Sequence, residues 1–167
     1  KIIYNSEFGS NISKKAELLS RVTACQSTLT VNDTSVTKFE TSEIINKVFG
    51  NSIQNSFKTF DFTSTNDNEL IGCAASNNGY EKRFGCTHKR EMFIDKKNNY
   101  LKGTDQIFKI KDGYPIRYAF RFHVNPMLSL VKTMSGNSAL IQISKNKSFL
   151  FTVSEENLEI EKSIFLG

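Results

Sequence analysis

The alternation of side chains along residues 114–124 limits the fold more than any other feature of the sequence. Successive side chains of a strand point to opposite faces, so residues two apart share a face. Apolar side chains occupy one such face: Ile116, Tyr118, Phe120, Phe122 and Val124. The alternate positions carry Arg117, Ala119, Arg121 and His123. We therefore predict one long strand here, with a core face and a basic face.

Most of the remaining order has the pattern of strands as well. Polar turns at residues 96–99 and 144–147 predict two hairpins, and only residues 13–20 and 43–49 have a helical pattern, both of them short. Residues 46–68, rich in Asn, Ser and Thr, are expected to be the least ordered. The sum predicts an all-β fold, an antiparallel β-sandwich with long loops. The other expected strands are residues 2–5, 27–31, 69–75, 91–95, 100–108, 139–143, 148–153 and 158–165.

The length of 167 residues is that of one domain able to bury a core. We expect a single β-sandwich domain over residues 1–167, cut from a larger protein, because the chain lacks an initiator Met and begins and ends on strand-like segments. No apolar stretch approaches the roughly 20 residues that span a bilayer. We predict no membrane partner, and the compartment is left open between the cytoplasm and the periplasm of a bacterium.

The net charge of +5 is spread along the chain without a dense basic block. Such a charge fits either a solvated basic surface or the binding of a polyanion. A nucleic-acid-binding β domain would present aromatic rings on its basic face. Along residues 114–124 the rings lie on the opposite face, so we predict no nucleic-acid partner, with that class kept as a rival suggested by charge alone.

The chain has three cysteines, Cys25, Cys73 and Cys86, and an odd number cannot all form disulfides within one chain. A chain of this length also does not need disulfides to be stable. We interpret them as mostly buried thiols in a reducing compartment. A Cys73–Cys86 bridge between neighbouring strands is the alternative.

Local motifs for catalysis or cofactor binding are missing from the sequence. It has no phosphate-binding glycine loop and no nucleophile elbow. A zinc site needs three or four ligands, and of the two histidines only His88 is a candidate ligand. We therefore predict no cofactor, with zinc or calcium as the alternative. Five aspartates at turn-like positions are expected to cap the backbone: Asp33, Asp61, Asp95, Asp105 and Asp112.

The basic side chains at alternate positions are the stronger candidates for a site. His88 and Arg90 share one strand face, and Arg117, Arg121 and His123 share another. If these faces adjoin, they form a cationic patch suited to carboxylates or sulfates, which arginine binds with two parallel hydrogen bonds. The alternative is internal pairing with acidic neighbours such as Glu81 or Glu91.

Four segments, in order over residues 21–167, resemble the heparinase II/III-like polysaccharide lyases. Residues 21–30, RVTACQSTLT, are similar to the family segment R-x-T-A-x-H-S-T-L-x, and residues 79–90, GYEKRFGCTHKR, to G-Y-x-x-x-x-G-x-x-H-x-R. Residues 121–126, RFHVNP, resemble R-F-H-x-H-P, and residues 159–167 resemble a late strand of the same domain. The sequence departs from the pattern at Gln26 and Asn125, where the family has histidine.

The resemblance implies the C-terminal β-sandwich of an enzyme whose N-terminal helical toroid is absent from this chain. Such enzymes cleave acidic, uronate-containing polysaccharides or oligosaccharides, such as glycosaminoglycans or alginate, by β-elimination, with much of the acid–base chemistry in the toroid. We expect this chain alone to be inactive, with the parent's helical domain and the acidic polysaccharide as its partners. The alternative is a non-catalytic carbohydrate-binding or structural module. The candidate substrate-cleft residues are Gln26, His88, Arg90, Arg121 and His123.

Overall fold

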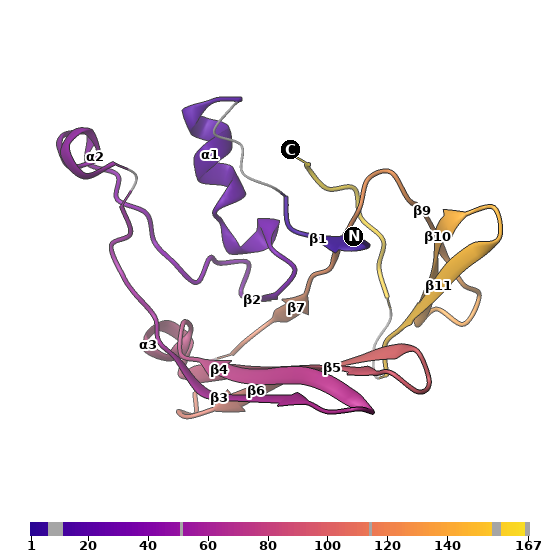
Figure 1. The fold of residues 1–167 in the computed structure, drawn as a ribbon. Helices are drawn as coiled ribbons and strands as arrows, with labels where there is room; N and C mark the ends of the chain where they lie inside the picture. The colour runs from indigo at the N-terminus through magenta and orange to yellow at the C-terminus, as the bar shows by residue number, and fades with distance from the viewer. Residues whose placement is uncertain (7–11, 51, 114, 155–157, 166–167) are drawn as a thin grey trace. The chain divides into compact units, whose positions relative to one another are not determined.

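The structure, a computed structural model, describes residues 1–6, 12–50, 52–113, 115–154 and 158–165 (Figure 1). Strands account for 43% of it and helices for 14%, in several antiparallel sheets, which confirms the predicted all-β, sandwich-like fold. The chain divides into two compact units. Unit 1 comprises Lys1–Arg21, Cys25–Ser27 and Phe122–Gly167, and unit 2 comprises Val22–Ala24 and Thr28–Arg121. Each unit is described by itself.

The largest sheet belongs to unit 2 and has the antiparallel order β3-β4-β5-β6. Its strands are β3 (Thr59–Asn66), β4 (Leu70–Asn77), β5 (Cys86–Asp95) and β6 (Tyr100–Lys109). The predicted hairpin between β5 and β6 is present. Its turn is held by Asp95, whose carboxylate accepts the Asn98 backbone N–H at 2.8 Å, and Asn99 takes the left-handed backbone conformation. This turn sets the register of the whole hairpin.

The core of unit 2 joins a second, short strand pair to β5 and β6. In this pair β2 (Leu29–Val31) lies antiparallel to β7 (Tyr118–Phe120). Leu29, Val31, Tyr80 and Cys86 are almost fully buried, and Ile107 and Phe120 pack against them. Cys86 and Ile107 lie on one face of the large sheet, so that face is the core face and the other is the outer face. Three helical segments complete this part of the chain: η2 (Thr23–Cys25), α2 (Glu43–Phe49) and α3 (Glu81–Phe84).

Unit 1 contains the two ends of the chain. A three-stranded sheet has the order β11-β10-β9, formed by β9 (Ser129–Lys132), β10 (Ser138–Ser144) and β11 (Lys147–Thr152). A separate pair joins β1 (Ile3–Tyr4) to β8 (His123–Val124). The helix α1 (Lys14–Ser20) begins where predicted, because the Ser13 side chain caps it by accepting the Ala16 N–H at 3.1 Å.

The prediction of one continuous strand over residues 114–124 is wrong. Tyr114 lies outside the described residues, and the rest forms two strands that belong to different units. Phe120 packs into the core of unit 2, whereas the Phe122 ring lies 5.1 Å from that of Phe151 in unit 1. Tyr118, expected in the core, is 53% exposed. The alternation therefore continued across a break between two strands, because residues 118–120 pair with β2 whereas residues 123–124 pair with β1.

Other expectations need smaller corrections. Residues 46–68, expected to be the least ordered, contain β3, and β9 was not foreseen. Residues 158–165, expected as a last strand, are not in a strand. All three cysteines are free, and only Cys86 is fully buried, whereas Cys73 is exposed. The register excludes the Cys73–Cys86 bridge. Cys73 of β4 lies opposite Met92, six residues along β5 from Cys86.

Candidate functional site

The centre of the candidate site is a histidine–aspartate pair on the core face of the large sheet. His88 on β5 is only 4% exposed, and its ring lies 6.1 Å from the ring of Phe120. Its Nε2 is 2.7 Å from the Asp105 carboxylate on β6, which is itself 11% exposed. A hydrogen bond between two buried polar groups is worth more than one in water, since the alternative is an unpaired buried group.

The hydrogen bonds around His88 determine its tautomer. The Asn77 side-chain oxygen accepts the Gly79 N–H at 3.2 Å, so the Asn77 amide nitrogen faces His88 Nδ1, at 3.4 Å. That nitrogen is a donor, and His88 Nδ1 must therefore accept. The proton is then on Nε2, which donates to Asp105. Both ring nitrogens of His88 are thus engaged inside unit 2.

Arg90 completes the cluster from the next position on the same face of β5. The register places it directly opposite Asp105, and its guanidinium donates from Nε at 2.7 Å and from Nη2 at 2.9 Å. Burial raises the pKa of the Asp105 carboxyl, but hydrogen bonds from His88 and Arg90 outweigh this and hold the pKa below its ordinary value. Asp105 is therefore an ionised acceptor for three N–H groups.

The His88–Asp105–Arg90 cluster corrects two expectations. Arg90 was expected to pair with Glu81 or Glu91 if its role were internal, and the carboxylate it binds is Asp105. Asp105 was expected at a turn, and it lies within β6. The missing step was to count along the predicted hairpin. Asp95 lies opposite Tyr100 at the turn. Each further pair is one residue earlier in β5 and one residue later in β6, which brings Asp105 opposite Arg90.

The segment of residues 79–90 that contains this cluster is largely architectural. A side chain at Gly79 would collide with Val36, since an added Cβ would lie 2.3 Å from it. Tyr80 is 1% exposed, and its hydroxyl lies 3.2 Å from the Leu29 carbonyl and 3.1 Å from the Thr34 carbonyl. Gly85 ends α3 in the left-handed conformation that glycine tolerates best. The segment thus places His88 and Arg90 on the core face.

Arg121 and Arg117 form a second basic group in unit 2. Both approach the carboxylate of Asp33, which is 68% exposed. Arg117 Nη2 is 3.3 Å from it and Arg121 Nη2 is 3.9 Å from it, and the Arg121 side chain is 33% exposed. Arg121 also donates its backbone N–H to the Thr28 carbonyl at 3.0 Å. These exposed ion pairs are weak compared with the pair of Arg90 and Asp105.

Gln26 and His123, the remaining predicted site residues, lie in unit 1. The Gln26 amide donates to the Ser20 carbonyl at 2.6 Å, at the C-terminal end of α1. His123 Nδ1 is 3.1 Å from the Ser163 hydroxyl, and the His123 backbone N–H donates to the Ser27 hydroxyl at 2.9 Å. The predicted site residues therefore fall into two groups: His88, Arg90 and Arg121 in unit 2, and Gln26 and His123 in unit 1.

The two positions that depart from the family pattern both use an amide to bind backbone. Gln26 caps a helix carbonyl, and the Asn125 amide donates to the Lys1 carbonyl at 3.2 Å while its oxygen accepts the Met127 N–H at 2.9 Å. Neither amide titrates near neutral pH. Each is thus suited to hold the chain in place and unsuited to transfer a proton.

The described part of the chain has neither a metal-binding cluster nor a membrane-spanning helix. Within residues 1–6, 12–50, 52–113, 115–154 and 158–165, no group of three or more His, Cys, Asp or Glu side chains is placed to hold a metal ion. No helix in those same ranges is long and apolar enough to cross a bilayer. Whether His88 binds a metal stays a prediction.

Comparison with known proteins gives one result for the chain as a whole. Residues 4–167 match the family described as "Heparinase II/III-like, C-terminal". The comparisons with curated proteins and with solved structures found no match. The match covers nearly the entire chain, both units and every candidate residue included. The chain therefore belongs to the heparinase II/III-like C-terminal family and is a polysaccharide-lyase-related domain.

Proposed function

We propose that this chain is the C-terminal β-sandwich part of a lyase that cleaves uronate-containing polysaccharides or oligosaccharides by β-elimination. The family match over residues 4–167 carries the proposal. The chain would act together with a helical domain of a longer parent protein that supplies the acid–base groups. By itself it would be inactive.

The reaction places a defined demand on the β-sandwich. A base removes the proton at C5 of the uronate, the C–H electron pair becomes the C4–C5 double bond, and the C4–O bond breaks as its oxygen takes a proton. Negative charge builds up on the uronate carboxylate in the transition state, and preorganised donors are needed to stabilise it. Arginine is the best-suited side chain for such a carboxylate.

The geometry supports Arg90 as the best-oriented donor in unit 2. Asp105 accepts hydrogen bonds from its Nε and its Nη2, which fix the plane of the guanidinium. The side chain is 23% exposed, so it is fixed in direction and still in contact with solvent. His88, with both nitrogens engaged, would act as a positioning residue that holds Asp105 and through it Arg90. Arg121, the other candidate in unit 2, would offer a second guanidinium to the substrate, and a role of Gln26 and His123 of unit 1 in substrate binding stays a prediction.

The test compares this chain with the longer parent protein on heparin, heparan sulfate and alginate. Ultraviolet absorbance of the unsaturated uronate product measures cleavage. We expect cleavage of at least one substrate by the parent and none by this chain. Turnover by this chain alone would contradict the division of labour, and a parent that binds acidic polysaccharide without cleaving it would contradict the lyase assignment.

A non-catalytic carbohydrate-binding or structural module is the second candidate. The observation that favours it is the internal use of both His88 ring nitrogens and of the Gln26 amide. The variant Arg90→Ala in the parent separates the two. A lyase cleft predicts loss of cleavage, whereas a structural module predicts loss of stability only.

A further inference from the structure

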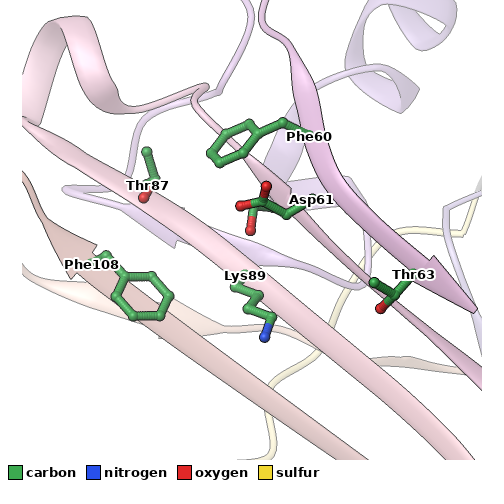
Figure 2. A pocket seen from close by; sticks show the side chains of 7 residues that line it. Phe60, Asp61, Thr63, Thr87, Lys89 and Phe108 are labelled. Carbon is green, nitrogen blue, oxygen red and sulfur yellow. The ribbon is translucent and has the colours of Figure 1, made fainter.

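The large sheet of unit 2 has a pocket on its outer face, opposite the His88–Asp105–Arg90 cluster. Alternation along β5 turns Thr87 and Lys89 away from His88 and Arg90. The pocket has a volume of about 490 Å³, within the range of small-molecule sites. Figure 2 shows Phe60 and Asp61 of β3 extending toward Thr87 and Lys89, with Phe108 of β6 beyond them. We call this the outer-face pocket.

The backbone of β3 is distorted where it lines the outer-face pocket. The pairing with β4 shifts register between Phe60 and Thr63, which marks a β-bulge, and Asp61 within it has a φ of 51°. Left-handed backbone is unfavourable for most side chains and free for glycine. The chain has aspartate at this bulge instead of glycine. Bulges re-aim side chains near binding sites, and this one directs a carboxylate to the pocket.

Two largely buried side chains offer hydroxyls to the outer-face pocket. Ser76 is 6% exposed and Thr87 is 9% exposed, and both line the outer-face pocket. Among the residues that the structure describes, neither hydroxyl has a hydrogen-bond partner. Their oxygens are not among the fully buried atoms that lack a partner, so both reach the pocket, where water or a ligand can bind them. A ligand with its own hydroxyls would pair with both.

The rest of the lining narrows the ligand to a sugar. Phe60 and Phe108 are 39% and 48% exposed, and their ring faces suit the partly positive C–H face of a pyranose. Lys89 is bound to Glu91 at 2.6 Å, so with Asp61 the local formal charge is −1. A uronate would be repelled by this charge. A neutral sugar has hydroxyls that can donate to Asp61 and exchange hydrogen bonds with Ser76 and Thr87.

We propose that the outer-face pocket binds a neutral sugar residue. This site is separate from the proposed uronate cleft in both position and ligand charge. It would hold a polysaccharide, or a glycan attached to a surface, by a unit that the lyase reaction does not use. The inference rests on unit 2 alone and does not require that the parent be a lyase.

The experiment is an amide-resolved NMR titration of the full chain with two neutral disaccharides, cellobiose and N,N′-diacetylchitobiose, and with glucuronate. The variants Asp61→Asn and Phe60→Ala remove one contact each. Asp61→Asn keeps a residue type that tolerates left-handed backbone, so it tests the charge without disturbing the fold. The matched control is Phe62→Ala, because Phe62 is 68% exposed in the same strand and does not line the pocket.

We expect a neutral disaccharide to shift the amide signals of residues around Asp61, Ser76 and Thr87. Asp61→Asn and Phe60→Ala should weaken binding about tenfold, the scale of one lost charge-assisted hydrogen bond or ring contact, and Phe62→Ala less than about twofold. The inference is overturned if neither neutral disaccharide binds at tens of millimolar, if glucuronate binds more tightly than both, or if Asp61→Asn leaves binding unchanged. Cleavage plays no part in this readout, so failure here leaves the proposed lyase function untouched.

Discussion

Replacing Asp105 with alanine is the sharpest test of the His88–Asp105–Arg90 cluster. The carboxylate accepts hydrogen bonds at 2.7 Å from His88, and at 2.7 and 2.9 Å from Arg90. Asp105→Ala leaves a guanidinium and a buried imidazole N–H without their acceptor. Removing one partner of a buried ion pair costs about 3–5 kcal/mol.

The expected loss lies below that range because water reaches part of the cluster. Arg90 is 23% exposed and can regain hydration, whereas His88 is 4% exposed and cannot. We therefore expect Asp105→Ala to lower the free energy of unfolding by about 2–3 kcal/mol. For a chain of this size each kcal/mol corresponds to about 2–4 °C, so Tm should fall by roughly 4–12 °C.

The dependence on pH tests the electrostatic origin of this loss. The pKa of the Asp105 carboxyl is held below its ordinary value of 3.8 in the folded chain. A lowered folded pKa stabilises the fold fully above the unfolded value and less as pH falls through the folded value. The stability gap between the wild-type chain and Asp105→Ala should therefore be constant at neutral pH and narrow below about 3.8.

The assay is denaturant and thermal unfolding of the wild-type chain, Asp105→Ala and the control Asp112→Ala. Asp112 is exposed, so its replacement should change the unfolding free energy by less than about 0.5 kcal/mol. A double-mutant cycle with Arg90→Met should give a coupling of at least about 1 kcal/mol. The reasoning is refuted if Asp105→Ala behaves like the control, or if its gap to the wild type does not depend on pH.

Three further predictions concern other positions. Arg121→Ala should cost less than about 1 kcal/mol, because its partner Asp33 is 68% exposed, and should raise the KM of an active parent protein; a large fall in Tm with unchanged KM would assign Arg121 to the scaffold. Gly85→Ala should destabilise the chain by about 1–2 kcal/mol in urea unfolding, because Gly85 has a φ of 60° and an added Cβ would lie 2.9 Å from Lys111; an unchanged midpoint would contradict this. Burial raises the pKa of the Cys86 thiol, so iodoacetamide should modify exposed Cys73 well before Cys86 in the folded chain, and equal rates measured by mass spectrometry would count against the buried assignment.

Local sequence determined those parts of the fold that depend on near neighbours. The helices at residues 14–20 and 43–49 were predicted from their helical pattern, and in the structure each begins after a serine cap. The β5–β6 hairpin followed from two strand-like segments around the turn of residues 96–99. The all-β class and the family resemblance came from the same kind of evidence. Turns and caps act over three or four residues, so a sequence pattern is sufficient to locate them.

Tertiary structure alone decided which side chains meet. Alternation over residues 114–124 is the same whether the chain forms one strand or two, and only the pairing of residues 118–120 with β2 and of residues 123–124 with β1 shows that it forms two. Counting across the predicted hairpin would have paired Arg90 with Asp105, but only the tertiary structure shows that this face is covered, with His88 only 4% exposed. The outer-face pocket is likewise lined by residues of four strands, β3 to β6. Contacts between strands depend on register across the sheet, and a pattern within one strand carries no information about its partner.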